Sequence, residues 1–147
     1  MFAEFFASKE FADAVTILQN EFPLAIWETF YVTIVSTAIA ILIGLPLGVL
    51  LAVGGKDGIL PLPRWLLTLL DVLINLLRSV PFLILMIMVF PLSRLIIGTT
   101  VGTRATIVPL VIAAFPFVAR LVESSLRELD SNIIEAAQSM GATPLQI

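Results

Sequence analysis

Three long apolar runs, separated by short polar stretches, dominate the chain. They cover residues 26–53, 65–92 and 105–121. At 1.5 Å per residue the first run would form a helix of about 42 Å, which exceeds the roughly 30 Å of a bilayer's hydrocarbon core. That helix must therefore tilt, kink or extend beyond the core. The pattern predicts an all-α integral membrane protein with about three transmembrane helices.

The first and third runs contain residues that favour close packing or bending. Gly44 and Gly48 are four residues apart, a spacing that lets a second helix approach closely in a membrane. Pro46 lies between them and is the expected kink, because proline removes a backbone hydrogen bond. The third run contains Pro109 and Pro116 and continues into an amphipathic extension. The charged residues of this extension are Arg120, Glu123, Arg127 and Glu128.

The second run carries polar residues where a membrane span is normally apolar. Asp71, Asn75 and Arg78 fall at i, i+4 and i+7 and share one helix face. Such a stripe either faces the bundle interior or water as a functional site, or lies at headgroup level and snorkels. Two roles stay open for Asn75, Arg78 and Ser79. Either they line or gate a path, or they pin a bent helix. Pro81 marks the bend, and the two halves are long enough to span only together.

The N-terminal segment, residues 1–24, differs from the membrane domain that follows at 25–147. It alternates aromatic and charged side chains, and Phe11, Val15, Leu18 and Phe22 fall on one helix face. An amphipathic helix lying in the interface plane fits this pattern, and a partly ordered leader is the alternative. Further loops are predicted at 54–64 and 93–104, where polar residues and glycine interrupt the apolar runs.

Positive charges give a small asymmetry between the two sides of this topology. One side holds Lys56, Arg64, Arg120 and Arg127, and the other holds Lys9, Arg94 and Arg104. Cytoplasmic loops carry an excess of Lys and Arg. The asymmetry therefore favours an N-terminus outside, in the periplasm, and a cytoplasmic C-terminal region.

Composition excludes several classes of function. Hydrophobic residues make up 59% of the chain and charged residues 13%, against about 25% charged in soluble domains. Cys and His are absent, which removes disulfides, thiol chemistry and most transition-metal sites. The net charge of −3 without a basic cluster argues against nucleic acid. Gly55-Lys56 lacks the spacing of a phosphate loop, so we expect no catalytic residue, metal or ATP site in this chain.

A short polar helix is predicted within residues 130–145. Asn132 is the expected N-cap, with Glu135 three residues later as its reciprocal partner. Gly141 lies where a helix end favours a residue that accepts positive φ. Thr143-Pro144 would then begin another helix, with Thr as N-cap and Pro at the first position.

This helix resembles the EAA loop of permease subunits in bacterial ABC importers. The pattern is E-A-A-x-x-x-G, carried here by Glu135, Ala136, Ala137 and Gly141. In that family the loop forms a cytoplasmic coupling helix that docks on the ATPase subunit. The resemblance implies that these four residues bind the ATPase, that small Ala136 and Ala137 permit close approach, and that Gly141 permits the turn.

Other segments extend the resemblance along most of the chain. Arg78 to Phe82 resembles the R-x-x-P element of amino-acid importer permeases, and the chain is similar to the permeases of methionine ABC importers. The carrying segments are 27–29, 44–51, 75–82, 107–110, 116–123 and 133–147. The resemblance implies a type I ABC importer permease fold in the bacterial inner membrane. Because its pattern continues into I-x-L-P and two further membrane helices, we expect a C-terminally truncated piece with three of five helices.

The resemblance also implies partners and a mechanism. These are a second permease copy, two ATPase subunits that bind ATP and Mg, a substrate-binding protein or lipoprotein, and membrane lipid. ATP binding would move the coupling helices and switch the spans between inward- and outward-facing states. Two alternatives stay open, a permease for another amino acid and a non-transporting scaffold with three spans.

Overall fold

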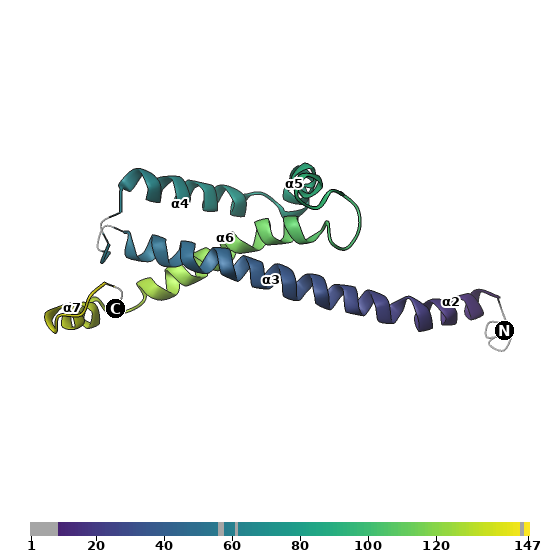
Figure 1. Cartoon of the computed structure of the whole chain (residues 1–147), viewed down its shortest axis with the longest axis horizontal. Helices are drawn as coiled ribbons and strands as arrows, with labels where there is room; N and C mark the ends of the chain where they lie inside the picture. The colour runs from purple at the N-terminus through teal and green to yellow at the C-terminus, as the bar shows by residue number, and fades with distance from the viewer. Residues whose placement is uncertain (1–8, 56–57, 61, 145) are drawn as a thin grey trace.

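The computed structural model describes residues 9–55, 58–60, 62–144 and 146–147, and in these residues every regular element is an α-helix. The first eight residues of the predicted N-terminal segment, together with Lys56, Asp57, Pro61 and Leu145, lie outside the described residues. The helices are α2 (Lys9–Asn20), α3 (Phe22–Val53), α4 (Arg64–Ser79), α5 (Phe82–Ile97), α6 (Ile107–Arg127) and α7 (Ser131–Ser139). The all-α prediction is confirmed (Figure 1).

The longest helical stretch joins the N-terminal segment to the first apolar run. α2 continues in the direction of α3, with a break at Glu21 (Figure 1), and residues Asp13–Val53 qualify together as one candidate membrane span. The amphipathic helix predicted in this segment is present as α2, and its position relative to the membrane plane stays a prediction. Pro46 lies inside α3, which continues on both sides of it.

Small residues bring α3 and α6 into close contact. The buried face of α3 repeats every fourth residue, as expected where i±4 ridges pack between two helices. It consists of Val32, Ser36, Ala40, Gly44 and Gly48, and the buried Leu51 follows three residues later. A Cβ atom on Gly44 would lie 2.7 Å from the Phe115 carbonyl oxygen, and one on Gly48 would lie 2.5 Å from that of Ala119. The predicted close approach at the two glycines is therefore confirmed.

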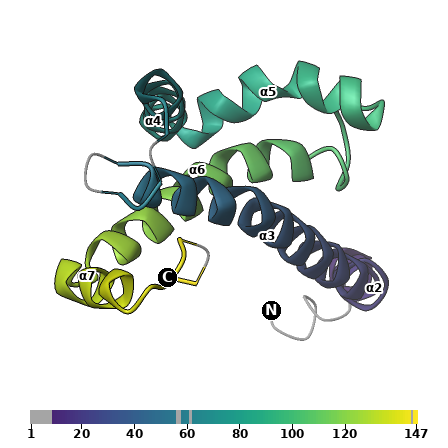
Figure 2. The ribbon, with the colours of Figure 1, turned by 60° about the vertical axis from the view of Figure 1, so that its left-hand side comes forward.

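The second apolar run is broken into α4 and α5, which are bent by 115° relative to each other. Val80 is extended, with φ −82° and ψ 127°, because the residue before a proline avoids helical backbone angles. The predicted bend at Pro81 is confirmed, although the two halves form a sharp corner (Figure 2). Both α4 and α5 pack against α6.

The loop predicted at 93–104 begins later than expected. α5 continues through the apolar residues Leu95 to Ile97 and ends at Gly98, whose φ is +86°. A left-handed residue of this kind ends a helix, and glycine adopts it without steric cost. Among the described residues, two helices are long and apolar enough to cross a membrane, or three if the bent pair is one span, which agrees with the predicted number.

Different segments of the chain lie at the two ends of the molecule. The connection between α3 and α4 lies at the same end as α7, and α2 lies at the opposite end (Figure 1). A hydrogen bond of 2.8 Å from the Thr103 hydroxyl to Glu28 joins the α5–α6 loop to α3. The arrangement matches the predicted topology, in which the 54–64 loop and the 130–145 helix share one side of the membrane.

The close approach of α3 and α6 predicts the sign of a mild substitution. Alanine favours a helix over glycine by roughly 1 kcal/mol, yet Gly48→Ala should lower stability by about 1–3 kcal/mol, because the new methyl group forces α3 and α6 apart. The measurement is thermal unfolding in detergent. Gly55→Ala is the matched control, since its Cβ would have its nearest neighbour at 3.5 Å. An increase in stability for Gly48→Ala would contradict the packing described here.

Candidate functional site

The helix α7 begins two residues earlier than the predicted cap implies. Asp130 is extended, with φ −64° and ψ 124°, and its side chain accepts a hydrogen bond from the Asn132 backbone N–H at 3.0 Å. The predicted N-cap at Asn132 is therefore wrong, because Asn132 is already helical and its own side chain donates to Asp130 at 2.8 Å. With the cap at Asp130, Glu135 falls beyond the position from which it could bond back.

The C-terminal end of α7 is closed by a Schellman motif. Gly141 has φ +84°, and its N–H donates to the Gln138 carbonyl at 2.9 Å. The Ala142 N–H donates to the Ala137 carbonyl at 3.0 Å. This pair of bonds satisfies carbonyls that a helix end otherwise leaves free. The predicted role of Gly141 in ending the helix is confirmed.

The chain turns again directly after Gly141. The Gln146 side chain accepts a hydrogen bond from the Thr143 N–H at 2.9 Å, and the Ile147 N–H donates to the Thr143 carbonyl at 3.3 Å. The first contact has the form of a capping box and the second is the first bond of a helical turn. These bonds agree with the predicted helix start at Thr143.

The surface of α7 is open to its surroundings along its whole length. None of its residues is buried, and Glu135 and Ala136 are exposed while Ala137 is half-buried. Ile133 is 64% exposed and Met140 83% exposed. Small and apolar side chains on an uncovered helix at one end of the molecule are what a docking surface for a protein requires.

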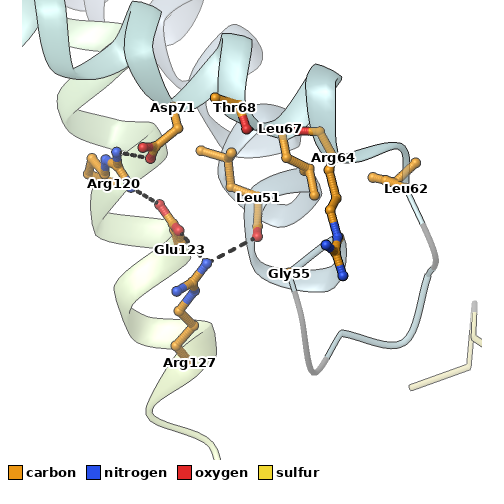
Figure 3. Close-up of a pocket in the computed structure, with 11 residues that line it drawn as sticks. Leu51, Gly55, Leu62, Arg64, Leu67, Thr68, Asp71, Arg120, Glu123 and Arg127 are labelled. Carbon is orange, nitrogen blue, oxygen red and sulfur yellow. Dashed lines mark hydrogen bonds and ion pairs between the residues drawn. The ribbon is translucent and has the colours of Figure 1, made fainter.

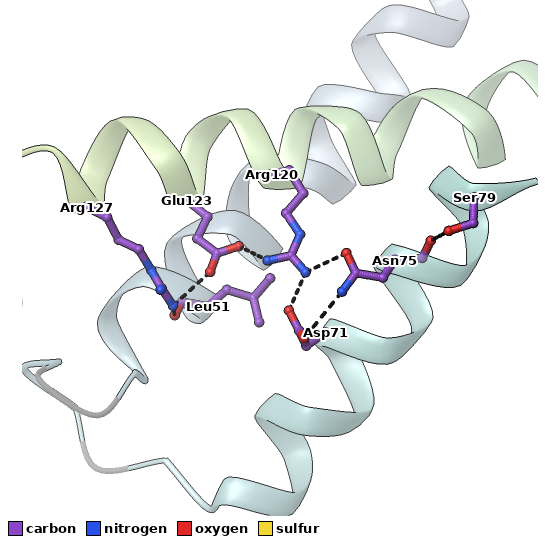
Figure 4. Close-up of polar contacts among 7 residues, drawn as sticks. All are labelled: Leu51, Asp71, Asn75, Ser79, Arg120, Glu123 and Arg127. Carbon is purple, nitrogen blue, oxygen red and sulfur yellow. Dashed lines mark hydrogen bonds and ion pairs between the residues drawn. The ribbon is translucent and has the colours of Figure 1, made fainter.

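The polar stripe of α4 meets charged residues of α6. Arg120 forms an ion pair with Asp71 and donates a hydrogen bond of 2.9 Å to the Asn75 side-chain oxygen. The Asn75 amide in turn donates to Asp71 at 3.4 Å. Asp71 and Asn75 of the stripe therefore face α6 at Arg120 (Figure 4). Arg120 supplies the charge that compensates Asp71.

The same cluster extends to the end of α3. Glu123 pairs with Arg120 at 2.6 Å and with Arg127 at 2.8 Å. Arg127 also donates to the Leu51 backbone carbonyl at 3.5 Å. That carbonyl lies in the last turn of α3, where intrahelical partners are missing. We name the set Asp71, Asn75, Arg120, Glu123 and Arg127 the polar cluster.

Sequence reasoning missed the α6 half of the polar cluster. It interpreted Arg120, Glu123 and Arg127 as part of an amphipathic extension of the third span. The i, i+3 and i+7 spacing placed them on one helix face. Their sign, two positive charges around one negative, complements the Asp71 carboxylate. The spacing of these three residues shows that they share one face of α6. Which helix lies opposite that face depends on the bend between α4 and α5.

The other predicted residues of α4 have different surroundings. The Ser79 hydroxyl donates to the Asn75 carbonyl at 2.7 Å, one turn before the bend. Arg78 is exposed and, in the described part of the chain, forms no hydrogen bond or ion pair. It lines a hollow of about 380 Å³ beside α6. Pro81 directly precedes α5. Asn75 therefore belongs to the polar cluster and Arg78 does not.

A larger hollow lies on the other side of the polar cluster. It has a volume of about 640 Å³ and is bordered by the end of α3, by α4 and by α6 (Figure 3). Its wall mixes apolar side chains such as Leu62 and Leu67 with Arg64, Asp71 and Arg127. The residues that the structure describes hold no group of acidic or other ligands suited to a metal ion. The chemistry of this region is electrostatic contact between helices.

Comparison with known proteins places this arrangement in a family. A family model described as the binding-protein-dependent transport system inner membrane component matches residues 44–147. The probable D-methionine transport system permease protein MetI of Vibrio cholerae is 51% identical over 126 residues, covering 84% of this chain and 54% of that protein. The D-methionine transport system permease protein MetI of Escherichia coli K12 is 44% identical over 122 residues, covering 83% and 56%.

Solved structures agree with the sequence relatives. The chain resembles a structure of the MetNI methionine ABC transporter in inward-facing conformations with a TM-score of 0.77 and 44% identity. The match covers 83% of this chain and 56% of that one. The chain therefore spans about half the length of the relatives that it matches. The predicted type I importer permease fold is confirmed for this half.

The polar cluster predicts unequal costs for its two carboxylates. The side chain of Glu123 is 7% exposed and that of Asp71 is 47% exposed. Glu123→Gln should cost more, about 2–3 kcal/mol, because it removes the charge of a buried carboxylate that accepts from both Arg120 and Arg127. Asp71→Asn should cost at most about 1 kcal/mol, because a half-exposed pair is screened by solvent.

These costs are measured by thermal unfolding of the purified protein in one detergent. Glu128→Gln is the control, because it removes a carboxylate from the end of α6 without touching the cluster. Equal losses for Glu123→Gln and Asp71→Asn would show that burial does not rank the two ion pairs.

Proposed function

The chain belongs to the family of binding-protein-dependent transport system inner membrane components, and from that premise we propose that it is part of the permease of an ATP-driven methionine importer. The proposal of methionine as the substrate rests on the high identity to D-methionine permeases across most of this chain. The fold likeness to the membrane subunit of a methionine transporter supports it independently of any one motif.

The partners follow from the same proposal. A second permease copy completes the membrane part, two ATPase subunits bind ATP and Mg, and a binding protein or lipoprotein delivers substrate. The permease itself carries out no chemical step. In this proposal the N-terminus lies on the periplasmic side. α7 lies in the cytoplasm with the loop between α3 and α4, which is at the same end of the molecule.

α7 is the proposed contact with the ATPase subunit. Its exposed Glu135 and Ala136 and its uncovered apolar residues offer a surface to a protein partner. Its position next to α6 allows a movement of the ATPase to reach the membrane helices. ATP and substrate then shift one equilibrium between inward- and outward-facing states, because each binds those states with different affinity.

Within the membrane region we assign different roles to the residues around the bend. Asn75 and Ser79 position α4, since one contacts Arg120 on α6 and the other closes the last turn before the bend. Arg78 forms part of the wall of the smaller hollow and is the residue of this group that faces a path for substrate. Pro81 fixes the corner between α4 and α5.

Uptake by the reconstituted complex tests the proposal. The full-length permease, purified with its ATPase and mixed with the binding protein in proteoliposomes, should import methionine only when ATP is inside with the ATPase. A polar amino acid such as glutamine is the substrate control. Import of the control in place of methionine would identify a permease for another amino acid, and failure to purify with an ATPase would favour a scaffold.

Gly141 provides a sharper test of α7. Gly141→Val should reduce methionine uptake at least about tenfold, because valine at φ +84° strains the motif that ends α7. The purified permease should remain folded, since a Cβ at Gly141 meets no atom within 4 Å. Uptake and ATPase activity of the same proteoliposomes are measured together.

The matched control for this substitution is Gly102→Val. Gly102 has φ +98° and the same free space around it, but it lies in the α5–α6 loop. Both variants therefore introduce similar backbone strain at different places. Uptake lost equally in both would show that strain alone, and not the position in α7, is responsible.

A further inference from the structure

α4 is held by few contacts. Its one buried residue in the structure is Ile74, which packs with Leu51 of α3 and Ala119 of α6. Asp71, Ile74 and Asn75 lie at i, i+3 and i+4 and thus on the same face of α4. The remaining anchor on this face is the contact of Asp71 and Asn75 with Arg120. The position of α4 therefore depends on this small apolar cluster, against which the partly buried Leu67 and Leu70 of α4 also pack, and on one guanidinium group.

Arg120 uses its donors within the protein. It contacts Asp71 and Asn75 of α4 and Glu123 of its own helix. A guanidinium that spans three acceptors on two helices holds them in a defined geometry, because its donors form a planar fork. Arg120 thus acts as a link between α4 and α6.

Three members of the polar cluster, Arg120, Glu123 and Arg127, lie on α6, the helix that precedes α7. α6 ends at Arg127 and α7 begins at Ser131. Arg127 contacts the Leu51 carbonyl at the end of α3, and Glu123 joins Arg127 to Arg120. Ionic contacts therefore connect the last two turns of α6 to both neighbouring helices (Figure 4).

We propose that Arg120 is a positioning residue that makes α4 follow α6 when α7 moves. Arg120 joins α4 to α6, and Glu123 and Arg127 extend this unit to the C-terminal end of α3. A displacement of α7 then moves α4 without separating it from α6. This inference rests on the proposed function in one respect, the coupling of α7 to an ATPase. The rigidity of the unit does not depend on which substrate is transported.

Distance measurement between spin labels tests whether the unit is rigid. The chain contains no cysteine, so single cysteines at the exposed residues Leu69 of α4 and Leu121 of α6 can be labelled selectively. Any cysteine elsewhere in the full-length permease is first replaced. An excess of unlabelled permease during assembly leaves at most one labelled copy in each complex. Distances are recorded by pulsed electron paramagnetic resonance, with and without ATP.

The informative variant is Asp71→Asn, because Arg120→Leu could prevent assembly altogether. In the unsubstituted protein we expect one narrow distance that is the same in both nucleotide states. In Asp71→Asn the fraction of molecules with a displaced α4 should rise about fivefold, the population change that corresponds to losing about 1 kcal/mol of a half-exposed ion pair. Asp71→Glu keeps the charge and should restore the narrow distance.

A second readout separates positioning from stability. Methionine imported per ATP hydrolysed should fall in Asp71→Asn and recover in Asp71→Glu, while the amount of assembled complex stays the same. Glu128→Gln is the control for removing a carboxylate near α7. A complex that imports no methionine in the unsubstituted form would refute the proposed function, and the spin-label distances would still decide the role of Arg120.

Three results would overturn the inference. The first is an identical distance distribution in Asp71→Asn and the unsubstituted protein. The second is a change of the α4–α6 distance between nucleotide states in the unsubstituted protein, since α4 would then not follow α6. The third is a displaced population of equal size in Glu128→Gln, which would assign the effect to charge in general.

Discussion

The close contact between α3 and α6 is the constraint on which the rest of the structure depends. Gly44 and Gly48 leave no room for a side chain between the two helices. In a membrane the lipid is as apolar as the side chains, so association relies on close packing and polar contacts. The two glycines provide the first, and their position near the end of α3 places the Leu51 carbonyl within reach of Arg127.

The bend at Val80 and Pro81 turns this pair of helices into a support for α4 and α5. If α4 and α5 formed one straight helix, both halves would run in the same direction along one neighbour. Because of the corner, the polar half, α4, lies along the charged end of α6, and the apolar half, α5, runs away from that end (Figures 1 and 2). Proline thus sets the direction of each half, and the ion pairs with Arg120 fix where the polar half rests.

Features fixed by neighbouring residues could be predicted from the sequence, and those fixed by distant residues could not. The helical class, the corner at Pro81, the packing glycines and the end of α7 at Gly141 all follow from local chemistry. The choice of Asp130 over Asn132 as N-cap depends on which residue is extended, and two capping residues so close in the sequence leave that undecided. The partner of Asp71 depends on the three-dimensional course of α4, which spacing along one helix cannot reveal.

The same distinction explains why α7 was recognisable in the sequence although nothing covers it. A helix of this length is marginal in isolation, and α7 has no buried residue to stabilise it. Its stability must come from local bonds, and both ends have them, at Asp130 and at Gly141. A helix that is held by its own caps keeps its shape before a partner binds, so its docking requires less ordering of the backbone. Only Glu128, Leu129 and Asp130 separate it from α6. In the proposed function, such a preformed helix would therefore pass a displacement to α6 with little loss in the connection.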